Sequence, residues 1–257
     1  MTKNYKYIYG PVPSWRLGSS LGIDPISYGK KTCSFDCVYC QLGKTDIFTD
    51  ERKIFVPAAE IIEELNLLPP LEIDYITFSG TGEPTLAENL GDMMKAVKKI
   101  RREKIAVLTN SSLMHREDVQ KDLFLADFVV AKLDAPSQAV FEQVNKPLNT
   151  SKIENIIRAI KDFKSCYVGR LALQIMFIKQ NKHYASELAK IAKEINPDEV
   201  QINTPLRPCR VEPLPESELN VIKGHFKGLN AIFVYEAEKK EVASISDEDT
   251  LKRRGKI

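Results

Sequence analysis

Apolar positions along the chain follow two spacings, one typical of amphipathic helices and one typical of buried strands. Pro57 can occupy a first helical turn, and the apolar residues that follow share one helical face until Pro69 ends the pattern. Helical spacing recurs at residues 86–100, 117–125, 153–160 and 188–195. Short apolar runs that indicate strands lie at residues 17–23, 73–78, 105–108, 128–133, 171–178 and 199–203. Strands that alternate with helices predict parallel βαβ units.

The count of strand and helix units bounds the architecture. Six units fit an α/β fold that is either a partial (β/α)6 TIM-type barrel or an open doubly wound sheet. In both architectures ligands gather at the carboxyl ends of the strands. A chain of 257 residues is normal for a single barrel. We expect a core domain at residues 1–235, followed by a charged, solvated tail at residues 236–257.

Charge and hydropathy limit the partners. With 37 basic and 35 acidic residues, composition does not require a nucleic acid or a membrane. No apolar run approaches bilayer length and no signal peptide is recognisable, so we expect a cytoplasmic protein without a membrane partner. The run Lys252, Arg253 and Arg254 is a weak hint of nucleic-acid binding, and a solvated terminus explains it better.

Cys33, Cys37 and Cys40 form a Cys-x3-Cys-x2-Cys run that places three thiolates on one short loop. A [4Fe-4S] cluster normally takes four cysteine ligands, so a loop with three leaves one iron open for another ligand. A disulfide framework is disfavoured by the odd cysteine count and the size of the chain. A structural zinc site would need a second ligand pair, and the nearest histidine, His115, stands alone.

The cysteine spacing, with Tyr39 before the third cysteine, resembles the signature of the radical S-adenosylmethionine (SAM) superfamily. The resemblance implies a partial (β/α)6 barrel rather than an open sheet. It also implies that the open iron of the cluster binds SAM, and that reductive cleavage of SAM yields a 5'-deoxyadenosyl radical. An electron donor such as flavodoxin or ferredoxin would then be a partner. The chemistry belongs to the cofactors, and the protein holds the reacting atoms in place.

The turn after residues 73–78 contains Gly80, Thr81, Gly82 and Glu83. Glycines at this position let the backbone approach a ligand closely. The turn resembles the glycine-glutamate-proline element of radical SAM enzymes, which implies that it holds the amino group of SAM. Asn110, after the next strand, either caps a helix or contacts the ligand.

Charged and polar residues also mark the next two strands. Lys132 and Asp134 lie on one side at the end of their strand, where they either face a polar cavity or pair with each other. By resemblance, Asp134 would accept hydrogen bonds from the ribose hydroxyls, and Lys132 would face the SAM carboxylate. Gln174 interrupts an apolar strand as either a contact inside the barrel or a satisfied amide.

The loop after residues 199–203 is polar and stiffened by prolines, which makes it a candidate for substrate contact. Arg207 and Arg210 suit phosphate or carboxylate. Cys209 is either a hydrogen-atom donor to a substrate radical, and so a candidate catalytic residue, or a small apolar filler. Cys166 is interpreted as structural.

Residues 10–25, together with the cysteine loop and the loop after residue 203, resemble small iron-sulfur oxidoreductases that are grouped with wyosine-type tRNA-modifying radical SAM proteins. This leaves the substrate open between tRNA, a peptide and a metabolite. Two alternatives also stay open. Besides a radical SAM enzyme that acts on its own substrate, the chain could be a non-catalytic iron-sulfur electron carrier or sensor, or an activase of a glycyl radical enzyme.

Overall fold

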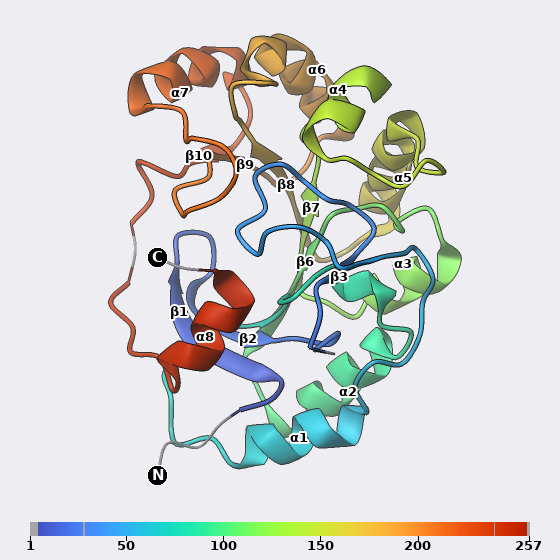
Figure 1. The fold of residues 1–257 in the computed structure, drawn as a ribbon, viewed down its shortest axis with the longest axis vertical. Coiled ribbons are helices and arrows are strands. Elements are labelled where there is room, and N and C mark those ends of the chain that lie inside the picture. Colours follow the sequence, from blue (N-terminus) through green and yellow to red (C-terminus); the bar gives the residue numbers. More distant parts are fainter. Residues whose placement is uncertain (1–4, 28, 239, 256–257) are drawn as a thin grey trace.

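A curled sheet of eight strands forms the centre of the molecule, in the order β1-β2-β5-β6-β7-β8-β9-β10 (Figure 1). The computed structural model describes residues 5–27, 29–238 and 240–255. β1 and β2 are antiparallel, and each later pair of neighbours is parallel. The strands are β1 (Ile8–Ser14), β2 (Gly18–Ile23), β5 (Tyr75–Phe78), β6 (Lys104–Thr109), β7 (Phe128–Lys132), β8 (Arg170–Met176), β9 (Glu199–Asn203) and β10 (Ala231–Phe233).

Helices follow the strands and cover the outside of the curled sheet (Figure 1). They are α1 (Ala58–Asn66), α2 (Leu90–Ile100), α3 (Glu117–Leu123), α4 (Gln138–Val144), α5 (Ile153–Cys166), α6 (Ala185–Ile195), α7 (Glu216–Lys223) and α8 (Asp247–Arg254). The apolar face of α2 is fully buried at Leu90, Met93 and Val97. This burial supplies most of the stability of such a helix, because removing apolar surface from water is favourable. None of the helices in the described ranges combines the length and apolar character needed to cross a bilayer.

The predicted fold class is confirmed. Seven consecutive parallel strands, β2 and β5 to β10, curl into a half-barrel, as expected of a partial TIM barrel. The prediction for β9 is correct at both ends, and the other predicted strands overlap the observed ones. Because the strands are buried on both faces, their apolar runs were visible without knowledge of tertiary contacts.

Two strands of the sheet, β1 and β10, were not predicted. β1 contains Pro11 and Pro13, and proline is tolerated in a strand mainly at a sheet edge, where its missing N–H breaks no ladder. β1 is such an edge strand. β10 has only three residues, which is too short for a periodicity signal.

The expectation of a solvated tail is wrong for α8. This helix packs across β1 (Figure 1), and Asp249, Thr250 and Arg253 are buried. Arg253 makes an ion pair with the buried Asp24 at the end of β2, at 3.5 Å. Alternating charges had concealed this buried face, because the buried side chains are themselves polar. The division between a core domain at residues 1–235 and a tail at residues 236–257 stays a prediction.

Candidate functional site

The three predicted cluster ligands lie on a loop that is held at both ends. β3 (Thr32–Cys33) pairs with β4 (Ile47–Phe48), and the segment between them crosses in front of the sheet in Figure 1. The loop also contacts the end of α4, where Val38 N donates to Val144 O at 3.0 Å. All three cysteines are free thiols of intermediate exposure. The loop therefore presents the thiols without burying them completely.

The predicted glycine turn is joined directly to the cysteine loop. Thr32 N donates to Thr81 O at 3.3 Å, and Glu83 N donates to Thr32 O at 3.2 Å. A Cβ atom on Gly82 would lie 1.6 Å from Thr32 O, well inside van der Waals contact. Only glycine allows this approach, so residue 82 brings the turn to the residue that precedes Cys33.

Glu83 is buried, and its carboxylate ties the turn to the next strand end. It accepts hydrogen bonds from Thr109 Oγ1 at 2.7 Å, from Asn110 N at 2.6 Å and from Thr85 Oγ1 at 2.7 Å. Burial raises the pKa of Glu83, and these hydrogen bonds oppose the rise. The carboxylate thus organises the site from within, and its expected contact with an amino group stays a prediction.

Two amide side chains lie beside the thiols. Asn110 donates to Ser34 Oγ at 2.9 Å and to Cys33 Sγ at 3.5 Å. Asn145, which the sequence did not single out, donates to Cys37 Sγ at 3.5 Å. Asn145 follows α4, a helix that was not predicted, and no motif marks it. These N–H groups are placed to stabilise negative charge on sulfur.

Asp134 is the centre of a buried polar group, here called the Asp134 cluster, with Tyr39, Lys132 and Asn145. Its carboxylate accepts from Asn145 Nδ2 at 2.8 Å, from Met176 N at 2.7 Å and from the Tyr39 hydroxyl. Lys132 Nζ lies 3.5 Å from Asp134 Oδ1, so these residues pair with each other, as one of the two interpretations expected. The predicted residues do converge beside the cysteine loop, since Tyr39 belongs to that loop.

Burial favours the protonated form of two of the thiols, Cys33 and Cys37. It raises the pKa of Cys37 to about 11, and the charge of Asp134 adds to the rise. Burial, followed by the charge of Glu83, also raises the pKa of Cys33. A cationic ligand would favour the thiolate forms of Cys33 and Cys37. Within the described ranges, no group of three or more His, Cys, Asp or Glu side chains is arranged so that it could hold a single metal ion.

Gln174 supplies an unsatisfied donor next to the Asp134 cluster. It stands opposite Lys132 in the register of β7 and β8, and its Nε2 atom is buried without a hydrogen-bond partner. The Oδ1 atom of Asn145 is buried and unpartnered as well. Buried polar atoms without partners are costly, so both atoms fit a polar ligand between the strand ends. The interpretation of Gln174 as a contact inside the barrel stays a prediction.

A cavity of about 470 Å³, which we call the arginine cavity, extends from the carboxyl ends of β5 and β9 to the turn between β1 and β2, at the amino end of β2. Its lining includes Gly80 after β5, Gln41 next to the third cysteine, and four arginines, Arg16, Arg207, Arg253 and Arg254. Of the two predicted substrate arginines, Arg207 lies in this cavity.

Arg210 and Cys209 lie elsewhere. Arg210 is exposed and binds the cysteine loop, through Asp36 Oδ1 at 3.1 Å and Cys37 O at 2.9 Å. The Cys209 thiol donates to Val211 O at 3.0 Å, and Cys209 is not part of the lining of the arginine cavity. The expected substrate contact of Arg210 and the hydrogen-atom donation by Cys209 gain no geometric support and stay predictions. Cys166 is exposed on α5.

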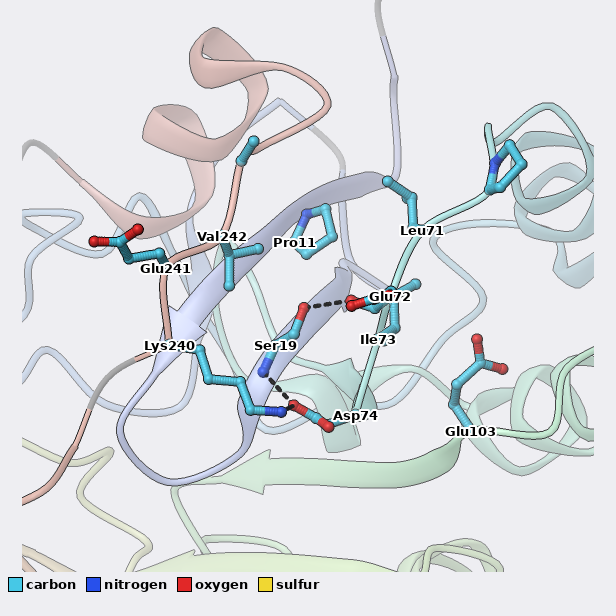
Figure 2. A pocket seen from close by; sticks show the side chains of 12 residues that line it. Pro11, Ser19, Leu71, Glu72, Ile73, Asp74, Glu103, Lys240, Glu241 and Val242 are labelled. Carbon is cyan, nitrogen blue, oxygen red and sulfur yellow. Dashed lines mark hydrogen bonds and ion pairs between the residues drawn. The ribbon is translucent and has the colours of Figure 1, made fainter.

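A second cavity, of about 600 Å³, lies at the opposite end of the sheet, before β5 begins (Figure 2). Asp74 there accepts from Ser19 N at 2.7 Å and from Lys240 Nζ at 2.6 Å. Its partners lower the pKa of Asp74, as expected of a paired surface carboxylate. This cavity has the character of a structural groove, because Asp74 and Lys240 pair with each other and the predicted site residues lie at the other end of the strands.

Asp24 and Arg253 support the glycine turn from behind. Asp24 accepts from Thr81 Oγ1 at 2.8 Å, and a Cβ atom on Gly80 would lie 2.3 Å from the Asp24 carboxyl carbon. Gly80 also has a φ of +147°, which favours glycine. Burial raises the pKa of Asp24 to about 6, against the lowering effect of Thr81 and Arg253. The helix α8 is thus linked to the site through one buried ion pair.

Comparisons with known proteins agree with this geometry. The Radical SAM superfamily matches residues 30–195 of the chain. A UPF0026 protein of Synechocystis sp. is 41% identical over 209 residues, which cover 81% of this chain and 78% of that protein.

Two solved structures resemble the fold. Streptococcus suis SuiB bound to S-adenosylmethionine has a TM-score of 0.62 at 16% identity, and the match covers 80% of this chain and 48% of SuiB. The chain therefore spans about half the length of SuiB. Archaeal TYW1 has a TM-score of 0.54 at 15% identity, and the match covers 82% of this chain and 72% of TYW1.

Proposed function

Because the chain belongs to the radical SAM superfamily, we propose that it holds a [4Fe-4S] cluster on Cys33, Cys37 and Cys40 and binds SAM at the open iron. This pair of cofactors supplies the reductive cleavage of SAM to a 5'-deoxyadenosyl radical, which abstracts hydrogen from a substrate. The enzyme is then an iron-sulfur oxidoreductase. The observation that carries the proposal is the docking of the glycine turn against the cysteine loop, through the contact of Gly82 with Thr32.

The residues around the loop fit both cofactors. Asn110 and Asn145 donate toward two of the sulfurs, which suits thiolates that carry negative charge. The unpartnered Nε2 of Gln174 and the carboxylate of Asp134 offer a donor and an acceptor to the polar groups of SAM. Tyr39 and Lys132 would complete that wall, and Gly80, Thr81 and Glu83 would orient the methionine end.

A cytoplasmic location and an electron donor belong to the same proposal. A reducing compartment keeps the thiols available for the cluster. A flavodoxin or a ferredoxin would deliver the electron, because both are one-electron carriers of low potential. The nearly balanced charge of 37 basic and 35 acidic residues supports a partner other than a membrane.

The test is SAM cleavage by protein that is reconstituted with iron and sulfide under anaerobic conditions. With dithionite and SAM, the wild type should form 5'-deoxyadenosine, measured by liquid chromatography and mass spectrometry. Cys37→Ala should lose the cluster absorbance and form no product above background. Cys166→Ala is the matched control, because this thiol is exposed on α5, and it should retain full activity.

Two results would contradict the proposal. Undiminished product formation by Cys37→Ala would show that the cysteine loop is not needed. A cluster whose spectrum does not change when SAM is added would favour an electron carrier or sensor instead.

A further inference from the structure

Three arginines from distant parts of the sequence meet in the arginine cavity. Arg16 lies in the turn between β1 and β2, Arg207 follows β9, and Arg254 is the last residue of α8. The cavity extends to Gln41, next to Cys40, and to Gly80 of the glycine turn. It therefore borders the site at which the proposed function places the chemistry.

Within the described residues, none of these three guanidinium groups has a carboxylate partner. Arg207 Nη1 donates to the neutral acceptors Arg254 O at 3.0 Å and Gln41 Oε1 at 3.5 Å. The Nε atom of Arg16 is buried and has no hydrogen-bond partner. A buried, unpartnered donor next to two further cations is costly unless a ligand satisfies it.

The fourth arginine of the lining, Arg253, behaves differently, because it pairs with the buried Asp24. Arg210 and Arg52, which do not line the cavity, pair with Asp36 and Asp122. Three of the four arginines of the cavity are therefore exceptions to charge pairing. Burial, with Arg207 as the next cause, lowers the pKa of Arg16 and of Arg254 to about 10. Both remain protonated at neutral pH, so the cavity keeps its positive charge.

We infer that the arginine cavity binds the oxyanion end of a small substrate that carries several negative charges, either as a di- or triphosphate or as a polycarboxylate. The inference rests on the proposed function for the reaction, and it adds the substrate class. Planar guanidinium groups match both oxyanions through paired hydrogen bonds. The end of the substrate away from the charge would then point toward Gln41 and the cysteine loop.

A small molecule fits this cavity better than a nucleic acid does. About 470 Å³ is the size of an ordinary small-ligand pocket. The three cations face inward, into a concave space, whereas the neighbouring Lys252 on the outer face of α8 pairs with Glu248 at 2.9 Å. With a net charge of +2, the chain also lacks the basic excess typical of nucleic-acid binding.

The chain contains a single tryptophan, Trp15, which lines the same cavity. The guanidinium carbon of Arg16 lies 5.3 Å from the centre of its ring. Tryptophan fluorescence therefore reports on occupancy of the cavity without any dependence on catalysis. The probes are tripolyphosphate, citrate and bulk tRNA, titrated into full-length reconstituted protein under anaerobic conditions and checked by calorimetry.

We expect tripolyphosphate or citrate to bind and to change the emission of Trp15. Arg16→Gln, Arg207→Gln and Arg254→Gln should each weaken that binding at least about tenfold, because each removes a charge-assisted contact. Arg16→Lys should bind with intermediate affinity, since it keeps the positive charge but loses the paired N–H donors of the guanidinium group. Arg158→Gln is the matched control, because Arg158 is exposed on α5, and it should bind like the wild type. The affinities of tripolyphosphate and citrate are compared, and the anion that binds more tightly shows whether the cavity prefers phosphate or carboxylate.

The inference is overturned if neither anion binds at millimolar concentration. It is also overturned if anion binding survives in all three glutamine variants. A third contrary result is that tRNA alone binds to the wild type and that the glutamine variants bind tRNA more weakly. Thermal unfolding of each variant shows that it is folded. Formation of 5'-deoxyadenosine is measured separately. Wild type that binds tripolyphosphate but never cleaves SAM refutes the proposed function and leaves this inference standing, and the reverse result refutes the inference alone.

Discussion

The Asp134 cluster and the arginine cavity both border the cysteine loop, one through Tyr39 and the other through Gln41, yet they treat charge in opposite ways. In the Asp134 cluster the carboxylate is balanced by Lys132 at 3.5 Å and by several hydrogen bonds. In the arginine cavity, as far as the chain is described, Arg253 pairs with Asp24, but Arg16, Arg207 and Arg254 have no carboxylate partner. A balanced group stabilises the fold by itself, whereas an unbalanced one is complete only with a ligand.

If the cysteine loop, docked against the glycine turn, organises both the Asp134 cluster and the arginine cavity, Gly82→Ala should have the largest effect of the substitutions considered. The added Cβ atom would meet Thr32 O at 1.6 Å, so the turn and the loop must separate. We expect a loss of about 4 kcal/mol or more in the free energy of unfolding, together with loss of iron binding and of anion binding. Chemical denaturation and iron analysis measure these effects.

Gly224→Ala is the control for this substitution. No heavy atom lies within 4 Å of the position that a Cβ atom would take at Gly224. Its stability should therefore change by less than about 1 kcal/mol. Normal iron binding by Gly82→Ala would break the link between the two regions.

Arg253→Gln asks whether the one paired arginine of the cavity lining differs from the three unpaired ones. The substitution leaves Asp24 buried without its counter-charge, which should cost about 3 to 5 kcal/mol. Lys252→Gln, at the exposed neighbouring position, should leave the stability almost unchanged, because an exposed ion pair contributes little. Thermal and urea unfolding measure both values. Equal effects would mean that α8 is not held by the buried pair.

The pH dependence of stability also tests the burial of Asp24. The pKa of Asp24 is raised to about 6, whereas an unfolded aspartate titrates near 3.9. The folded state binds this proton more tightly, so its contribution is complete below about pH 4 and is lost as the pH rises through about 6. From about pH 4 to about pH 7, the wild type should lose about 3 kcal/mol relative to Asp24→Asn.

Urea unfolding at several pH values measures this difference. Asp162→Asn, at an exposed position on α5, is the control and should follow the wild type. Parallel curves for the wild type and Asp24→Asn would show that the pKa of Asp24 is not raised.

The most direct comparison sets Asp134→Asn against Arg16→Gln in protein without ligand. Asp134→Asn removes the acceptor for Tyr39 and the counter-charge of Lys132, and it should cost about 2 kcal/mol. Arg16→Gln relieves repulsion from Arg207 and should be neutral or stabilising by less than about 1 kcal/mol. Unfolding free energies decide between them. A cost above 2 kcal/mol for Arg16→Gln would mean that the arginine is structural.

Elements with strong local signals were predictable. The strands β5 to β9 are buried on both faces, so their apolar runs stand out in the sequence. The spacing of the three cysteines by itself indicates an iron-sulfur cluster with one open iron. Residues at the carboxyl ends of those strands, such as Glu83 and Asp134, follow from the rule that parallel strands collect ligands there. Their convergence beside the cysteine loop is therefore a consequence of the pattern.

Other parts of the site had no local signal. Asn145 contacts Cys37 from the position that follows α4, a helix whose seven residues are too few for a clear period. Arg210 and Arg207 are separated by two residues and looked equivalent, yet one binds Asp36 at the surface and the other enters the cavity. Which way a loop side chain points depends on contacts that the loop's own residues do not specify.

By itself, the sequence determined the alternation of strands and helices, the loop of three cysteines and the glycine turn, because periodicity and the spacing of ligands are local properties of the chain. Periodicity left a barrel and an open sheet both possible, and only the family resemblance implied the half-barrel. Only the tertiary structure decided that α8 folds back on β1 and that Arg16, Arg207 and Arg254 share one cavity. Residues separated by more than two hundred positions meet only when the whole sheet has curled. Whether a charge finds a partner is then settled by three-dimensional packing.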